Sequence, residues 1–125
     1  MTVTVSRHFV GELFRGVPQL HRERGSLLRR AGISPGWLDA RHGRVTVGQF
    51  ATLYRLLVNE CDDETPGFFS RPLRGGTLKL LCLSLLDAPT LKVALHRYRL
   101  FFRILLDDFG YEVSHGDARV RIGLV

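Results

Sequence analysis

Apolar positions repeat with a helical period through most of the chain, most densely between residues 71 and 108. In residues 77–86, leucines and one cysteine cover nearly the whole circumference of the predicted helix, a pattern typical of a helix buried on all sides. The sequence Asp-Ala-Pro-Thr at 87–90 then predicts a tight turn, and a second helix with one apolar and one cationic face follows it. The pattern therefore predicts a buried helical hairpin at the centre of the domain.

Shorter helical patterns occupy the N-terminal half, at residues 9–17, at 27–31 and around Trp37. Thr46 and Gln49 have the spacing of a capping box, in which each residue satisfies a backbone N–H at the start of a helix. An apolar stripe follows this box as far as residue 58, so we expect a long amphipathic helix there. The polar, acidic segment 59–67 predicts a loop.

The apolar period changes from 3.6 to 2 after Gly110. Alternating apolar residues on either side of the turn sequence His115-Gly116-Asp117 predict an antiparallel β-hairpin. The expected fold class is α+β: a mainly helical domain of five or six helices with a central helical hairpin and a small C-terminal antiparallel β-sheet.

A chain of 125 residues fits a single domain that can bury a core without disulfides or metals. Its longest apolar run, residues 80–86, is far shorter than the roughly 20 residues that span a bilayer. The N-terminus has no pattern of a signal peptide, so we expect a cytoplasmic protein. Cys61 and Cys82 have no metal or redox spacing, and we expect Cys82 to be the more buried of the two.

The net charge of +6 comes mainly from arginines that are dispersed along the chain. One cationic stripe stands out on the second helix of the predicted hairpin, formed by Lys92, His96, Arg99 and Arg103. The stripe could contact phosphates, but it has few side chains that read base edges, and the preceding helix is too apolar to cross a DNA backbone. We therefore favour a solvated or partner-facing stripe over direct nucleic-acid binding.

No constellation in the sequence is typical of an enzyme or of a metal or cofactor site. The carboxylates at 62–64 are consecutive in a loop, which favours a solvated acidic segment over a metal site. The five histidines form neither an HxxxH nor an HExxH pair. Gly75 and Gly76 precede a predicted helix and could place an anion at its N-terminus, although a plain loop-to-helix junction is the simpler reading.

Taken together, the segments resemble the N-terminal regulatory domain of a subgroup of AraC/XylS-type bacterial transcription regulators, a domain often labelled arabinose-binding-like. The resemblance covers almost the whole chain, and its pieces are specific through their order and spacing. They are residues 28–33, Arg44-Val45, Gln49-Phe50, Leu53-Tyr54, Arg71-Pro72, 75–81, 88–91, Ala94-Leu95 and 98–108 with the hairpin after them.

The resemblance implies a domain that senses a small-molecule effector, forms a homodimer and controls a C-terminal pair of helix-turn-helix motifs that binds promoter DNA. We expect residues 1–125 to form this sensor domain alone, because no recognition helices follow within the chain. A haem or gas sensor is the alternative, since helices followed by a small sheet also describe such domains; His96 is the best placed axial ligand. A direct nucleic-acid-binding module is a third possibility.

For a ligand site, the sequence points to the space between three predicted helices. Tyr54, Cys82 and Tyr98 lie on the apolar faces of these helices, and each carries a polar atom that a purely apolar core does not need. Tyrosine hydroxyls at the rim of a core, bonded to backbone or water, are the alternative reading for Tyr54 and Tyr98.

Overall fold

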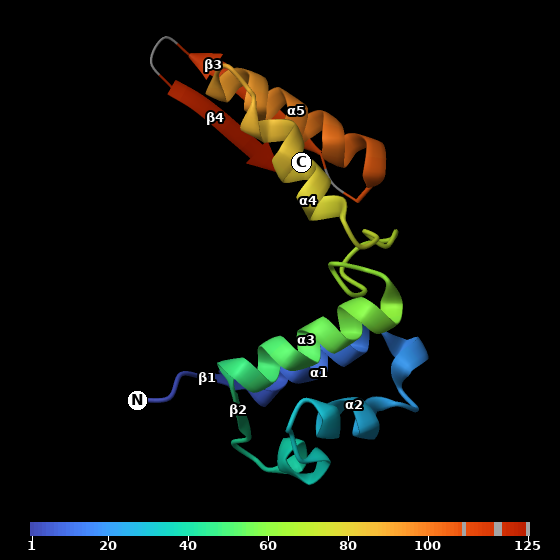
Figure 1. The fold of residues 1–125 in the computed structure, drawn as a ribbon. Coiled ribbons are helices and arrows are strands. Elements are labelled where there is room, and N and C mark those ends of the chain that lie inside the picture. The colour runs from blue at the N-terminus through green and yellow to red at the C-terminus, as the bar shows by residue number, and fades with distance from the viewer. Residues whose placement is uncertain (109, 117–118, 125) are drawn as a thin grey trace.

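The computed structural model describes residues 1–125 except 109, 117–118 and 125 (Figure 1). Its elements, in chain order, are β1 (Thr4–Ser6), α1 (Arg7–Gly16), η1 (Pro18–Leu20), α2 (Arg24–Arg30), η2 (Pro35–Asp39), β2 (Arg44–Thr46), α3 (Val47–Cys61), α4 (Thr77–Leu86), α5 (Leu91–Leu105), β3 (Tyr111–Gly116) and β4 (Arg119–Leu124). Helices dominate and a small antiparallel hairpin ends the described chain, as the α+β prediction requires.

The predicted capping box at the start of α3 is confirmed. The Gln49 amide donates to the Thr46 hydroxyl over 3.1 Å, and the Thr46 amide donates to the Gln49 side-chain carbonyl over 2.9 Å. The Gln49 side-chain amide also donates to the carbonyl of Gly32, which follows α2, over 2.7 Å. The Gln49 side chain thus stabilises the start of α3 and holds the end of α2 beside it.

A two-stranded antiparallel sheet near the N-terminus was not predicted. Strands β1 and β2 pair in the register Thr4↔Thr46, Val5↔Val45 and Ser6↔Arg44. Each strand is three residues long and leads directly into a helix, α1 or α3. Residues 2–6 do alternate between threonine or serine and valine, but each strand is shorter than the four to eight residues over which alternation indicates a strand.

The first of two hydrophobic cores lies among α1, α2 and α3. Its members are buried residues of these helices and of the segments that join them. They are Val10, Leu13, Phe14, Val17, Leu27, Leu28, Ala31, Ile33, Leu38, Val45, Leu53 and Leu57. This first core therefore holds the N-terminal half together without any contribution from α4 or α5.

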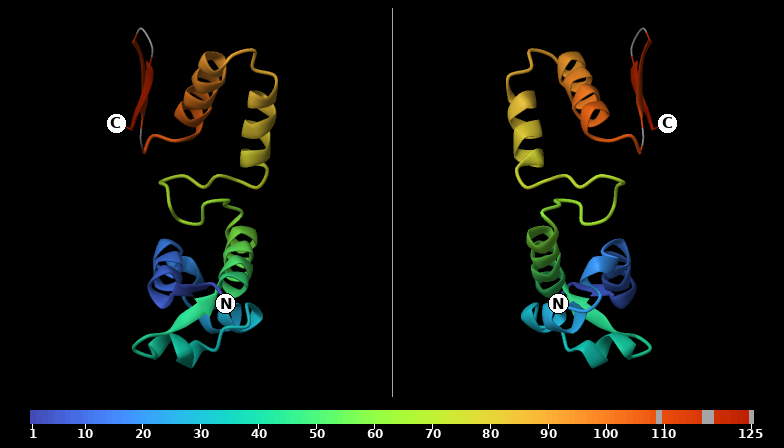
Figure 2. Two further views of the ribbon diagram at one scale, coloured as in Figure 1. Left: turned by 90° about the vertical axis from the view of Figure 1, so that its left-hand side faces the viewer. Right: turned by 90° about the vertical axis from the view of Figure 1, so that its right-hand side faces the viewer.

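The second core is smaller and belongs to the hairpin of α4 and α5. It consists of Leu73, Leu81, Phe102 and Leu106, with partly buried aromatic and aliphatic residues around them. The helical hairpin is therefore present, but the two cores lie on opposite sides of the loop at 62–76 (Figures 1 and 2). The predicted central position of the hairpin does not describe this arrangement.

The prediction that α4 is buried on all sides is wrong. Leu81 is 5% exposed, whereas Leu80 is 61% and Leu86 is 80% exposed. Cys82 is exposed and Cys61 is half-buried, the reverse of the order expected from the sequence. The physical reason is that α5 covers one face of α4 only, so an all-apolar helix here leaves most of its circumference in solvent.

The predicted C-terminal hairpin is confirmed in the described residues. Strands β3 and β4 pair antiparallel, with Glu112 opposite Gly123 and Ser114 opposite Arg121. Of the predicted turn His115-Gly116-Asp117, Asp117 lies outside the described residues. In the part of the chain that the structure describes, no helix is both long and apolar enough to cross a membrane.

The main chain at the end of α1 lies directly against the main chain of the loop that follows α3. Gly67 has a φ of +70°, and a Cβ built on it would lie 1.8 Å from the carbonyl oxygen of Gly16. A side chain at position 67 would therefore collide with the main chain of α1 as well as strain its own backbone. This contact fixes the loop against the first core.

The two sides of α4 give a test of the packing. Replacing Leu81 with Ala should lower the free energy of unfolding by about 2–3 kcal/mol, because it empties a buried position of the second core. The same change at Leu80 should cost under about 0.5 kcal/mol, since that side chain already faces solvent. Chemical denaturation of the two variants measures both values, and equal losses would contradict the one-sided packing of α4.

Candidate functional site

Tyr54, the first residue of the predicted ligand site, lies on α3 against the first core. Its hydroxyl donates a hydrogen bond to the backbone carbonyl of Glu64 over 2.8 Å. Burial raises the pKa of this hydroxyl, and the negative charges of Asp63 and Glu64 raise it further. The hydroxyl therefore stays protonated and serves as a donor that holds the loop after α3.

Cys82 and Tyr98, the other two predicted residues, lie on the helical hairpin. Tyr98 packs against the second core, with its ring edge-on to Phe102 at a centroid distance of 4.8 Å. Cys82 is exposed on α4. The structure thus places Tyr54 and Tyr98 in different cores and does not gather the three residues around one of the hollows described below. Their role in ligand binding stays a prediction.

The acidic loop is built around a buried carboxylate, not the solvated segment that the sequence suggested. Asp63 is 5% exposed. One of its oxygens accepts hydrogen bonds from the amides of Thr65 and Leu73, each over 3.0 Å, and from the Thr65 hydroxyl over 3.2 Å. The other accepts from the Gly67 amide over 3.1 Å. Asp63 therefore ties the two ends of the loop together through backbone N–H groups.

The neighbouring carboxylates occupy the N-terminus of α4. Glu64 accepts from the amides of Gly76 and Leu78 over 2.7 and 2.8 Å. Asp62 accepts from the Gly75 amide and from the Arg74 guanidinium, and the Arg74 bond above all lowers the pKa of Asp62. An anion does bind where the Gly-Gly sequence suggested one, but it is supplied by the chain's own side chains.

The structure locates the side chains that the sequence offered as metal or haem ligands. In the described ranges, no group of three or more His, Cys, Asp or Glu side chains is placed to hold a metal ion. His96, the proposed axial ligand, is exposed on α5 within the cationic stripe.

A hollow of about 470 Å³ lies between α5 and the hairpin of β3 and β4. It is the candidate ligand site. Its lining residues come from three elements: Arg99 on α5, Glu112 and Ser114 on β3, and Arg121, Ile122 and Gly123 on β4. Residues two apart on a strand share a face, and cross-strand partners share it too. The pairing therefore places Glu112, Ser114 and Arg121 on one face of the hairpin.

The charges of this hollow favour an anionic group. Arg99 and Arg121 bring two guanidinium groups, and Glu112 brings one carboxylate, so the balance is positive. Guanidinium groups bind carboxylate or phosphate through paired N–H donors, and the Ser114 hydroxyl can donate or accept. The volume is within the usual range of small-molecule sites, roughly 300–1,000 Å³. The only sequence signal for this site was the alternation in β3 and β4, which predicts a hairpin but no ligand site.

A second hollow, of about 370 Å³, lies at the Gly16–Gly67 contact. Glu12 and Arg15 line it and form an ion pair with each other over 3.1 Å, on side chains that are 60% and 78% exposed. Their charges are thus already matched. This second hollow has no excess charge to select a ligand and is the weaker candidate.

Most of the chain, residues 22–125, matches the model of one protein family, the arabinose-binding domain of AraC transcription regulators, N-terminal. The chain therefore belongs to this family, whose members are regulatory ligand-binding domains. The resemblance inferred from the sequence is confirmed. Neither the curated proteins nor the solved structures contain a significant match.

The buried carboxylate in the acidic loop makes a direct stability test possible. Asn at position 63 keeps one acceptor oxygen but turns an N–H toward the Gly67 amide. Asp63→Asn should therefore lower the free energy of unfolding by about 2–3 kcal/mol. Asp39→Asn, at an exposed aspartate, is the matched control and should change it by less than about 0.5 kcal/mol. Urea denaturation near neutral pH decides, and equal effects would show that Asp63 does not organise the loop.

Proposed function

We propose that this chain is the effector-sensing and dimerisation domain of an AraC-type transcription regulator. In this proposal it controls a helix-turn-helix DNA-binding domain outside these 125 residues. Family membership supports the regulatory and ligand-binding role. The observation that carries the location of the effector is the hollow between α5 and the hairpin, with Arg99 and Arg121 in its lining.

The proposed effector is a small molecule with a carboxylate or a similar anionic group. Arg99 and Arg121 would take the anion, while Glu112 and Ser114 would orient a donor group on the same ligand. Such a ligand would touch α5 and both strands of the hairpin at once. It would therefore stabilise one orientation of the hairpin over others, which is the differential binding that a ligand-driven switch needs.

The space around Tyr54, Cys82 and Tyr98 remains the rival location for the effector. Tyr54 already has a backbone acceptor for its hydroxyl, so replacing it affects the loop whether or not a ligand binds nearby. Tyr98 and Cys82 lie on α5 and α4, so a ligand there would act on the helical hairpin instead of the strands. Variants at Tyr98 and at Arg99 therefore separate the two locations.

We expect small carboxylates to bind where their amides do not. The probes are lactate, succinate and benzoate, each compared with its amide by calorimetry on the 125-residue chain. For any probe that binds, Arg99→Gln or Arg121→Gln should weaken binding about tenfold or more, because each removes a charged donor from the anion. Arg103→Gln is the matched control, since Arg103 belongs to the same cationic stripe but is not among the lining residues.

Two results would contradict the proposed location. One is unchanged affinity in both arginine variants. The other is loss of binding in Tyr98→Phe together with normal binding in Arg99→Gln and Arg121→Gln, which would move the site to the rival location. Failure of every carboxylate to bind would contradict the anionic class of ligand.

The cationic stripe on α5 leads to a separate expectation about DNA. Lys92, His96, Arg99 and Arg103 are all exposed, as predicted, but arginine, lysine and histidine side chains in one row bind phosphates without reading sequence. The chain alone should therefore show at most weak DNA binding that disappears at moderate salt. Gel shifts with promoter and scrambled duplexes measure this, and sequence-dependent binding that survives salt would favour the nucleic-acid-binding alternative.

A further inference from the structure

Three charged side chains of opposite sign line the hollow between α5 and the hairpin. Arg99 comes from α5, Glu112 from β3 and Arg121 from β4, and all three are exposed. Among the residues that the structure describes, the ion pairs join other side chains, so Glu112 pairs with neither arginine. In the second hollow, by contrast, Glu12 and Arg15 pair with each other. The charges of the first hollow are therefore available to a ligand.

The register of the hairpin places two of these charges side by side. Glu112 lies opposite Gly123, and Ser114 lies opposite Arg121. Because these are successive pairs on one face of the hairpin, Glu112 and Arg121 are diagonal neighbours at a separation of about 7–8 Å. A small ligand that lies between them can contact the carboxylate and the guanidinium at once.

Gly123 leaves open space beside the Glu112 carboxylate. A Cβ built on Gly123 would have no listed neighbour atom within 4 Å. A larger side chain at this position would lie directly opposite Glu112 and would fill that space. The glycine therefore keeps the carboxylate accessible from the hollow.

Glu112 restricts which anions the hollow can hold. A guanidinium binds a carboxylate through paired N–H donors, whereas an ionised glutamate only accepts hydrogen bonds. A simple dicarboxylate could satisfy Arg99 and Arg121, but it would also bring like charge close to Glu112, which costs affinity. An ammonium group on the same ligand removes this cost, because it donates to Glu112 and has the opposite charge. The ligand that matches all three side chains has two carboxylates and one amine.

We propose that the effector is an amino acid with two carboxylates, of the aspartate or glutamate type, and that Glu112 selects it by binding its ammonium group. Arg99 and Arg121 hold the two carboxylates. This inference rests on the proposed function, since it uses the same hollow, and it adds the class of effector and the residue that discriminates. Each charge of the ligand then faces an opposite charge of the hollow, and such complementarity favours specificity.

Calorimetry on the 125-residue chain tests the need for the amine with pairs of probes. L-aspartate is compared with succinate, and L-glutamate with glutarate, because each pair shares its carboxylates and carbon chain and differs only in the amine. We expect the amino acid of at least one pair to bind about tenfold or more tightly than its partner, since a charge-assisted hydrogen bond is gained. The N-acetyl amino acid, which has no cation, should bind like the amine-free acid.

Glu112→Gln separates selection from folding, because it should act in opposite directions on the two kinds of probe. Binding of the amino acid should weaken about tenfold or more, as its ammonium group loses a charged acceptor. Binding of succinate or glutarate should stay the same or tighten, as the repulsion disappears. Glu23→Gln is the matched control and should change neither, since Glu23 is exposed beside α2 and its side chain caps no amide.

Gly123→Val tests whether the space beside Glu112 is where the ligand lies. The added side chain should weaken every acid that binds by about tenfold or more, because it occupies the space next to the carboxylate. The far-ultraviolet circular dichroism spectrum should stay unchanged, since the new Cβ meets no listed neighbour atom. Normal binding in this variant would contradict the location.

Equal affinity for each amino acid and its amine-free partner would overturn the proposal, and so would a Glu112→Gln variant that weakens both alike. If Arg99→Gln still abolishes binding in that case, the anionic site of the proposed function stands and only the selection by Glu112 fails. Selective binding that survives both Arg99→Gln and Arg121→Gln would place the ligand elsewhere and overturn both. Failure of every acid to bind, with or without an amine, would also overturn both.

Discussion

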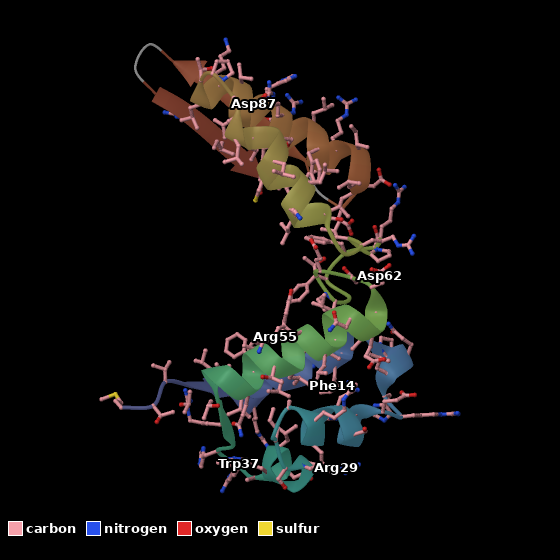
Figure 3. All side chains as sticks on the ribbon, in the orientation of Figure 1. Phe14, Arg29, Trp37, Arg55, Asp62 and Asp87 are labelled. Carbon is pink, nitrogen blue, oxygen red and sulfur yellow. The ribbon has the colours of Figure 1, made fainter. Side chains whose placement is uncertain are left out.

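The Asp63 carboxylate is the interaction on which the arrangement of the chain depends. It is buried, and it collects backbone N–H groups from both ends of the loop, at residues 65–67 and at Leu73 (Figure 3 shows the neighbouring Asp62 in the same segment). A buried charge is costly unless hydrogen bonds satisfy it, and here backbone donors do so. The consequence is a loop of fixed shape between two separate hydrophobic cores.

The three consecutive acidic residues at 62–64 each connect a different part of this segment. Asp62 ends α3 in the left-handed conformation and bonds forward to Gly75, Asp63 closes the loop, and Glu64 starts α4 through its first amides. The Tyr54 hydroxyl adds a further bond from α3 to the same segment. The first core is therefore linked to the helical hairpin by directed polar contacts more than by shared apolar packing. An effector that acts on the helical hairpin would therefore act on elements that specific hydrogen bonds join to the N-terminal half.

The sequence predicted local structure well because local signals determine it. The capping box at Thr46, the two-faced helix after Thr90 and the alternation in the last fifteen residues each specify one element, and each element is present. The sheet of β1 and β2 was missed because its strands are very short, and the other errors concern which residues are covered by neighbours, as at α4 and Asp63. Leucines around all sides of α4 are typical of burial, yet burial depends on neighbours that periodicity cannot supply. The candidate ligand site was missed for the same reason, because it joins Arg99 to strands whose distance from α5 is set by the fold.

The contact between Gly16 and Gly67 leaves no room for a side chain at position 67 of the loop. The two main chains touch there without any side chain between them. Of the two neighbours of Gly67, Pro66 is fully buried and Phe68 is 65% exposed, so only the second is free to vary in size. At position 67 a single added methyl group has no place to go. Among relatives of this chain that keep the same loop, position 67 should therefore stay glycine even where the exposed residue after it changes.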